Sequence, residues 1–218
     1  MTIKVLLADD HSILRHGLAE ALAIEEDIEI VGQAKDGLSA IKLVRKLTPD
    51  IVVMDISMPD INGMDATREI TRDFPEVKVI GLSMHSAKKF VREMFKAGAA
   101  GYVLKDCDFD ELALAIRTVM AGKTYMTPEI TGNIVDNYLR TPDEPDEPLS
   151  FANLTKRERE VLQLLAEGNT TKQIGLKLHI SPKTVEAHRL RVMDKLEIDN
   201  VAQLTKFAIQ EGLTSLDM

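Results

Sequence analysis

The chain has 218 residues, of which 44% are hydrophobic and 28% are charged, and it carries a formal net charge of −8. This length allows two modest domains that each bury a core, and the composition is that of an ordinary globular protein. No apolar run approaches the roughly 20 residues of a membrane span, and the first residues enter a predicted strand at once, so we expect a cytoplasmic protein without signal peptide or membrane partner. The single cysteine, Cys107, excludes an internal disulfide, and we interpret it as a small side chain at a loop-to-helix junction.

Residues 3–121 alternate short β-branched runs with amphipathic helical patterns five times, which is typical of βα units that wind a parallel sheet. Besides the second strand run, four runs are typical of buried strands: 3–8, 51–54, 77–82 and 102–104. Helices are predicted at 12–24, 37–47, 63–73, 87–97 and 108–121, the last with a start, Asp108 and Glu111, similar to a capping box. The pattern predicts a doubly wound α/β domain, with a five-stranded parallel sheet, over residues 1–122.

Polar side chains suited to phosphoryl chemistry stand directly after these four runs: Asp9 and Asp10, Asp55, Ser83 and Lys105. Because the carboxyl edges of parallel strands meet at one crevice, we expect these side chains to share a pocket. Three carboxylates repel one another unless a cation lies among them, and an all-oxygen set with room for water suits Mg²⁺. The pocket is therefore predicted to transfer phosphate onto a carboxylate. Asp55, which ends the central strand, is the predicted acceptor.

A linker is predicted over residues 123–153. It begins with a helical stretch near 128–139 and continues into residues 141–148, which hold three prolines, four acids and no apolar residue. Such a segment has nothing to bury and should be extended and solvated. We interpret its acids as solubilising; the alternative is that they hold a basic face of the C-terminal part inactive.

The C-terminal part, residues 154–218, has a purely helical period. Helices are predicted at 156–167, 171–178, 182–196 and 200–211. Capping boxes are indicated at Thr155 with Glu158 and at Thr170 with Gln173, and Ser181 stands before a proline at the first helical position. Only three residues join the second helix to the third, so the two must meet at a sharp angle. This geometry is that of a helix-turn-helix, whose second member can enter a DNA major groove.

The predicted recognition helix, 182–196, has an apolar side and a basic side. Val185, Val192 and Leu196 recur at helical spacing and should face the core. Four residues on the opposite face are offered to base edges: Lys183, Glu186, Ala187 and Leu190. Five others are placed against phosphates: Thr184, His188, Arg189, Arg191 and Lys195. His188 is equally well explained as a hydrogen-bonded structural histidine.

Four motifs of the first half resemble the response-regulator receiver family: Leu7-Ala8-Asp9-Asp10-His11, Met54-Asp55-Ile56-Ser57-Met58-Pro59-Asp60, Leu82-Ser83-Met84 and Gly101-Tyr102-Val103-Leu104-Lys105. The resemblance implies that a sensor histidine kinase phosphorylates Asp55. It also implies that Asp10 and Asp55 bind Mg²⁺ directly with the Ser57 carbonyl, and that Asp9 acts through water. Ser83 and Tyr102 are similar to the family's two switch residues. One departure is Asp106, which follows Lys105 where many receivers have proline.

The stretches 154–162, 181–189 and 195–196 resemble the LuxR/NarL-type helix-turn-helix. Two departures are Gly175, where alanine is usual, and Glu197, where a glycine often ends the recognition helix. Together the two resemblances imply a phosphorylation-controlled transcriptional regulator and not an enzyme. Since one helix-turn-helix reads few base pairs, a homodimer on paired half-sites is expected. Its surface is either on the receiver or on the last helix, at Val201, Leu204, Thr205 and Ala208.

Three other functions are compatible with parts of this sequence. An Mg²⁺-dependent aspartyl-phosphate hydrolase would need a second acid two residues after the nucleophile, where this chain has Ser57. A flavin carrier would need a phosphate-cradling loop after the first strand, where this chain has Asp9 and Asp10. A regulator that binds DNA without phosphorylation would leave the acidic set without a role.

Overall fold

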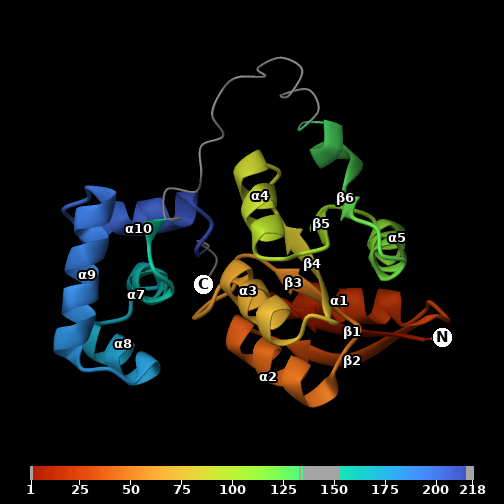
Figure 1. The fold of residues 1–218 in the computed structure, drawn as a ribbon, viewed down its shortest axis with the longest axis horizontal. Coiled ribbons are helices and arrows are strands. Elements are labelled where there is room, and N and C mark those ends of the chain that lie inside the picture. The colour runs from red at the N-terminus through yellow and green to blue at the C-terminus, as the bar shows by residue number, and fades with distance from the viewer. Residues whose placement is uncertain (1, 133, 135–152, 215–218) are drawn as a thin grey trace.

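The computed structural model describes residues 2–132, 134 and 153–214. Its first half contains a six-stranded parallel sheet of order β2-β1-β3-β4-β5-β6 (Figure 1). The strands are β1 (Ile3–Ala8), β2 (Ile28–Ala34), β3 (Ile51–Asp55), β4 (Lys78–Ser83), β5 (Gly101–Leu104) and β6 (Tyr125–Met126). The predicted number of five strands is wrong by one. The two-residue β6, which pairs with Gly101 and Tyr102, is too short to leave a period in the sequence.

Helices cover both faces of the sheet, which confirms the doubly wound α/β fold. They are α1 (Ser12–Leu22), α2 (Gly37–Leu47), α3 (Gly63–Asp73), α4 (Lys88–Lys96) and α5 (Phe109–Met120). Successive strand residues point to opposite faces, so Val53 packs in the cluster with α1 and α5, whereas Val52 packs in the cluster with α2, α3 and α4. Both faces of the central strand β3 are thus buried, and its last residue, Asp55, lies at the carboxyl edge of the sheet.

The segment after β6 is described only at its start. Residues 128–132 and 134 are helical, which agrees with the helix predicted near 128–139. The rest of that helix and the acidic residues 141–148 lie outside the described residues. Within the described part of the chain, no helix has both the length and the apolar character needed to cross a membrane.

Four helices form the C-terminal part: α7 (Lys156–Ala166), α8 (Thr171–Leu178), α9 (Pro182–Leu196) and α10 (Val201–Gln210). The capping boxes predicted at Thr155 and Thr170 are confirmed, and the Ser181 side chain accepts from the backbone N–H of Thr184. The box predicted at Asp108 is wrong, because its side chain makes no cap hydrogen bond. The short α8–α9 connection gives the predicted helix-turn-helix (Figure 1).

The two parts pack against each other through α7, and α9 lies on the side of α7 away from the sheet (Figure 1). One apolar cluster runs from Met58 and Met64 of the first part to Leu154 and Leu162 of the second. The recognition helix is therefore not the element that faces the receiver.

Candidate functional site

The side chains predicted to share a pocket meet at the carboxyl edge of the sheet. Lys105, at the end of β5, places its Nζ 2.9 Å from Asp9 Oδ2 and 2.8 Å from Asp55 Oδ2. Asp9 and Asp55 are almost fully buried, at 2% and 1% exposure, as is Ser83 at the end of β4. Residues that follow three strands far apart in sequence thus place an ammonium between two carboxylates. This is the meeting of strand ends predicted for a parallel sheet.

The electrostatics of this pocket are dominated by burial. Burial raises the pKa of the Asp55 carboxyl to about 7, opposed by the Lys105 ammonium and reinforced by the charge of Asp9. For Lys105, burial alone would lower the pKa, but the two carboxylates outweigh it and raise the pKa. Without added positive charge, Asp55 is thus poorly stabilised as an anion.

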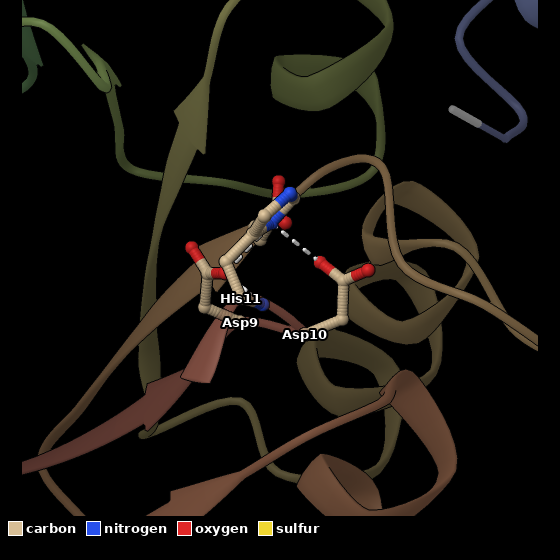
Figure 2. A group of neighbouring side chains, drawn as sticks. Asp9, Asp10 and His11 are labelled. Atoms are coloured by element: carbon tan, nitrogen blue, oxygen red, sulfur yellow. Dashed lines mark hydrogen bonds and ion pairs between the residues drawn. The ribbon is translucent and has the colours of Figure 1, made fainter. Parts of the chain in front are cut away.

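The acidic end of the pocket offers a compact set of donor atoms. One ligand atom from each of Asp9, Asp10, His11 and Asp55 lies within 4.8 Å of the others. The His11 imidazole lies between the two neighbouring carboxylates, with Nδ1 2.9 Å from Asp10 Oδ1 and 3.3 Å from Asp9 Oδ1 (Figure 2). Three carboxylates that converge in this way fit a hard divalent cation, for which oxygen ligands are preferred.

The loop after β3 is tightly held around the site. The backbone N–H of Ser57 donates to Asp55 Oδ1 at 3.1 Å, and the N–H of Gly63 donates to the Ile56 carbonyl at 2.8 Å. A Cβ at Gly63 would lie 1.9 Å from the Asp55 carbonyl oxygen, so only glycine fits there. Hydrogen bonds therefore hold both ends of loop 56–62. The bond from Ser57 joins the loop to Asp55, the predicted phosphoacceptor.

The two predicted switch residues lie together beside this loop. Tyr102 is fully buried and donates its hydroxyl to the His85 carbonyl at 2.7 Å, while Ser83 Oγ accepts from the His85 N–H at 3.0 Å. Tyr102 does not lie on an edge strand, because β6 adds to the sheet beside β5. His85 also stacks on Phe90 of α4, with ring centroids 4.4 Å apart. Both switch residues thus hold the start of the α4 region.

A cavity of about 740 Å³ opens over the site and includes groups from both parts of the chain. Its lining includes Asp55, Ser57 and Lys105 from the receiver, and Ile209 and Thr214 from the end of the second part. The C-terminal turn is held there by an ion pair of 2.9 Å between Lys89 and Glu211. Asp55, the predicted phosphoacceptor, and the second part of the chain consequently line one cavity.

Cys107 stands apart from this chemistry. Burial raises the pKa of its thiol to about 11, with help from the carboxylates of Glu111, Asp106 and Asp108. A thiol with such a pKa is a weak nucleophile at neutral pH, which agrees with its interpretation as a packing residue.

The recognition helix α9 presents most of its predicted DNA-contacting residues to solvent. Exposed positions are Lys183, Thr184, Ala187, Leu190, Arg191 and Lys195, and partly exposed positions are Glu186, His188 and Arg189. Val185 and Val192 are buried, as predicted, and Leu196 is partly buried. The face offered to DNA is thus available in this arrangement.

Several of these side chains already have partners within the domain, and Thr184 Oγ1 lies 2.8 Å from Ser181 Oγ. Arg189 forms an ion pair with Glu186 one turn earlier. Lys195 Nζ lies 2.7 Å from Glu158 Oε2 and 3.3 Å from the Asn153 carbonyl oxygen, so it also ties α9 to the start of α7. His188 Nδ1 is buried without a protein hydrogen-bond partner.

Two of the four residues suggested for a dimer surface on α10 close the domain core instead. Leu204 and Ala208 are buried in the domain core, and Thr205 donates to the carbonyl of Val201 within the same helix. Of the four residues named for that surface, Val201 has a large apolar side chain in the open, at 40% exposure.

Sequence reasoning missed two residues that matter in the structure. His11 directly follows the acid pair, and that position was the available signal. Gln163 is a polar residue within the apolar run of α7 and is only 1% exposed, because its amide contacts the loop after Asp55. A glutamine inside such a run is itself a signal of a buried polar contact.

Comparison with known proteins agrees with both halves of the structure. A family model described as response regulator receiver domain matches residues 5–117, and one described as bacterial regulatory proteins, luxR family, matches residues 152–208. The transcriptional regulatory protein DegU of Brevibacillus brevis is 36% identical over 96% of this chain and 94% of its own. The oxygen regulatory protein NreC of Staphylococcus epidermidis is 38% identical over 97% and 99%.

Solved structures give the same assignment. A LuxR-family two-component response regulator from Aurantimonas sp. is 36% identical with a TM-score of 0.62, and covers 64% of this chain and 100% of that one. A complex of the response regulator RcsB with DNA is 28% identical with a TM-score of 0.59, over 95% and 98%. The fold and the acidic pocket, followed by a helix-turn-helix, define a two-domain response regulator. This chain belongs to the LuxR-type response regulators, and it is a DNA-binding transcriptional regulator.

Proposed function

We propose that Asp55 accepts a phosphoryl group and that this reaction controls DNA binding by the C-terminal helix-turn-helix. In the reaction a carboxylate oxygen of Asp55 attacks phosphorus, and the bond from phosphorus to the donor breaks, with the electron pair leaving on the donor. The observation that carries this proposal is the position of Lys105 Nζ between Asp9 and Asp55. Its ammonium can neutralise a transferred phosphoryl group, which such transfer requires more than it requires covalent machinery.

We further propose that Mg²⁺ binds at Asp10, Asp55 and the Ser57 carbonyl, with Asp9 acting through water. When bound, the ion would supply the positive charge that offsets the crowded carboxylates and the incoming phosphate. The convergence of three carboxylates and His11 within 4.8 Å supports this assignment. Ser83 and Tyr102 are proposed to report the phosphoryl group to α4, since both contact His85.

The test is intact-mass analysis after incubation with acetyl phosphate and Mg²⁺. The full chain should gain one phosphoryl group, and Asp55→Asn should gain none. Asp73→Asn is a matched control, because Asp73 pairs with Arg72 on the surface, away from the pocket. Phosphorylation of Asp55→Asn, or none of the wild type, would refute the assignment.

On the DNA side, we propose that Lys183, Glu186, Ala187 and Leu190 face base edges, while Thr184, His188, Arg189, Arg191 and Lys195 lie near phosphates. Full or partial exposure on α9 leaves all of these side chains available for such contacts. A sensor histidine kinase is the proposed donor, and a homodimer on paired half-sites is the proposed DNA-bound form. A solved structure of two RcsB dimers bound to two parallel DNAs supports the dimeric part of this proposal. Selection of bound fragments from random DNA, before and after phosphorylation, tests the coupling.

We propose that the chain is a phosphoryl acceptor and not a hydrolytic enzyme. Ser57 occupies the position where an aspartyl-phosphate hydrolase would need its second acid. Residues 1–122, 123–153 and 154–218 are proposed as receiver, linker and DNA-binding domain, and a cytoplasmic location stays a prediction. Intact-mass analysis tests this proposal. A phosphoryl group that accumulates on Asp55 indicates an acceptor, whereas a fast hydrolase would not accumulate it.

A further inference from the structure

His11 stands at the start of α1, but its side chain does not serve the helix. It is the N-cap residue, and the imidazole makes no cap hydrogen bond. Short side chains that carry an oxygen are preferred at that position, because they accept from the first free N–H groups of the helix. The His11 side chain is 44% exposed, so it does not fill the core either. Neither capping nor packing therefore explains why this residue is a histidine.

The imidazole of His11 is turned instead toward the acidic end of the pocket (Figure 2). Its Nδ1 lies 2.9 Å from Asp10 Oδ1 and 3.3 Å from Asp9 Oδ1. The backbone N–H of His11 donates to the same Asp9 oxygen at 2.7 Å, which fixes the peptide that carries the ring. With Asp55 included, one donor atom from each of four residues lies within 4.8 Å of the others. One nitrogen donor thus joins three carboxylates.

The separations between these donor atoms are those expected of ligands that share one cation. In an octahedral shell with bonds of about 2.1 Å, neighbouring ligand atoms lie about 3 Å apart. The two distances from His11 Nδ1, 2.9 and 3.3 Å, are close to this value. A cation bound by Asp10 and Asp55 would therefore have the ring nitrogen next to its carboxylate ligands.

The carboxylates around this nitrogen have few hydrogen-bond donors. Asp9 and Asp55 are 2% and 1% exposed. Three of the buried oxygens, Oδ2 of Asp9 and of Asp55 and Oδ1 of Asp10, form ion pairs with Lys105 or His11 but no hydrogen bond within the described part of the chain. Buried carboxylate oxygens ordinarily have hydrogen-bond partners, so these three atoms can accept a cation without losing one.

The mixture of donors bears on which cation the pocket prefers. Mg²⁺ is bound mainly through oxygen and gives up its water reluctantly, whereas an imidazole nitrogen suits the divalent transition metals. Mn²⁺ is the member of that series that best fits an octahedral shell rich in oxygen. A set of three carboxylates with one imidazole consequently favours Mn²⁺, because the carboxylates serve either ion and the nitrogen serves the transition metal.

From these observations we propose that His11 ligates the cation of the pocket through its imidazole nitrogen and gives the pocket a preference for Mn²⁺ over Mg²⁺. This inference rests on the proposed cation site at Asp10 and Asp55, and it adds a ligand to that site. His11 is then a specificity-determining residue. At equal concentrations of the two ions, the pocket takes up Mn²⁺.

The test compares the affinities of the full chain for the two ions, with His11→Ala as the main variant. Free Mn²⁺ is followed by its electron paramagnetic resonance signal, and Mg²⁺ by competition with bound Mn²⁺. Removal of the imidazole should weaken Mn²⁺ binding by about 10-fold or more, the lower end of losses at metal sites, and leave Mg²⁺ affinity nearly unchanged. His16→Ala is the matched control. His16 is an exposed histidine of the same helix that contacts the Ser12 carbonyl and lies outside the donor set, so both affinities should stay the same.

Pulsed electron paramagnetic resonance of bound Mn²⁺ gives a readout that a merely structural role would not change. A directly bound imidazole adds a coupling to its nitrogen nucleus. This coupling should be present in the wild type and in His16→Ala, and absent from His11→Ala. A wild type without the coupling overturns the proposal and leaves His11 as a hydrogen-bond partner of Asp10. An equal loss of affinity for both ions in His11→Ala, or no loss for either, overturns it as well.

Asp55→Asn separates these outcomes from failure of the proposed function. This variant should bind both ions more weakly, and acetyl phosphate with Mg²⁺ should still label the wild type. If both results hold while the His11 results fail, the proposed function stands and only the nitrogen ligand is refuted. Equal Mg²⁺ affinity in the wild type and Asp55→Asn would refute the proposed cation site and, with it, the role of His11.

Discussion

Lys105 holds the Asp55 carboxylate at 2.8 Å, yet burial still raises the pKa of Asp55 to about 7. The same ammonium is shared with Asp9 at 2.9 Å, so one cation faces two buried anions. The unloaded pocket is therefore short of positive charge, and proton binding at Asp55 relieves the deficit.

The pH dependence of stability should expose this deficit. The folded pKa of Asp55 exceeds its ordinary value of 3.8, so the folded state binds the proton more tightly than the unfolded state. Its contribution to stability is full below the ordinary pKa and is lost as pH rises towards about 7. Asp55→Asn cannot ionise, so it should be more stable than the wild type at about pH 8, with the difference closing near pH 4.

Urea unfolding in metal-free buffer at several pH values measures this difference. Asp73→Asn serves as the control, because pairing with Arg72 lowers the pKa of that exposed carboxyl and no such profile is expected. A stability gap for Asp55→Asn that does not change with pH would contradict the account of the pocket.

The receiver pocket could be predicted from the sequence because it depends on local order. The acidic and basic residues follow β-branched runs. Because the carboxyl ends of parallel strands converge, these residues meet in one pocket. The strand β6 could not be predicted, because two residues contain no period. The capping box of α2 could not be predicted either. It is formed by Asp36 and Ser39, whereas the usual sequence pattern has Ser or Thr followed three residues later by Glu or Gln.

The contact between the domains could not be predicted, for a different physical reason. The side chain of Gln163 contacts Met58 and Asn62, about a hundred positions away in the sequence. The helical period of α7 does not indicate which surface Gln163 contacts. The role of Leu204 and Ala208 shows the same limit: helical spacing identifies an apolar face, but not whether that face meets the core or a second copy.

Gly175 in α8 should not tolerate alanine, although alanine is the better helix former by about 1 kcal/mol. A Cβ there would lie 2.8 Å from the backbone oxygen of Ile180, in the turn of the helix-turn-helix. We expect Gly175→Ala to lower the free energy of unfolding by about 1 to 2 kcal/mol, as overpacking does. Gly17→Ala is the matched control. Its Cβ would meet nothing within 4 Å, so thermal unfolding should show a gain.

Glu197 should benefit from the opposite change. It ends α9 with φ of 54° and ψ of 38°, a left-handed conformation that costs a side-chain-bearing residue about 1 to 2 kcal/mol. Glu197→Gly should therefore stabilise the chain by about 0.5 to 1 kcal/mol after the entropy of glycine is counted. The midpoint of urea unfolding measures this gain, and a loss of stability would show that Glu197 has a contact that matters more than its backbone.

Glu158 should stabilise the fold in a way that depends on pH. Burial alone would raise its pKa, but Lys195 and the Thr155 cap outweigh burial and lower the pKa from 4.5 to about 2. This contribution is present above the ordinary pKa and is lost as pH falls towards about 2. Glu158→Gln retains the capping side chain and removes the charge, so at neutral pH it should cost about 1 to 2 kcal/mol. The cost, measured by urea unfolding, should shrink below about pH 4.

Two residues of α9 should affect DNA binding in different ways. Arg191 is exposed and is proposed to lie near phosphates, so Arg191→Ala should weaken binding to every sequence and reduce the slope of log affinity against log salt by about 0.9. Glu186 pairs with Arg189, so Glu186→Ala removes an acceptor for cytosine and also frees a guanidinium. We expect Glu186→Ala to change the order of preferred sites and to strengthen binding to non-specific DNA. Fluorescence anisotropy on selected and random duplexes, at several salt concentrations, separates the two effects. An equal loss on all duplexes for Glu186→Ala would place its side chain away from the bases.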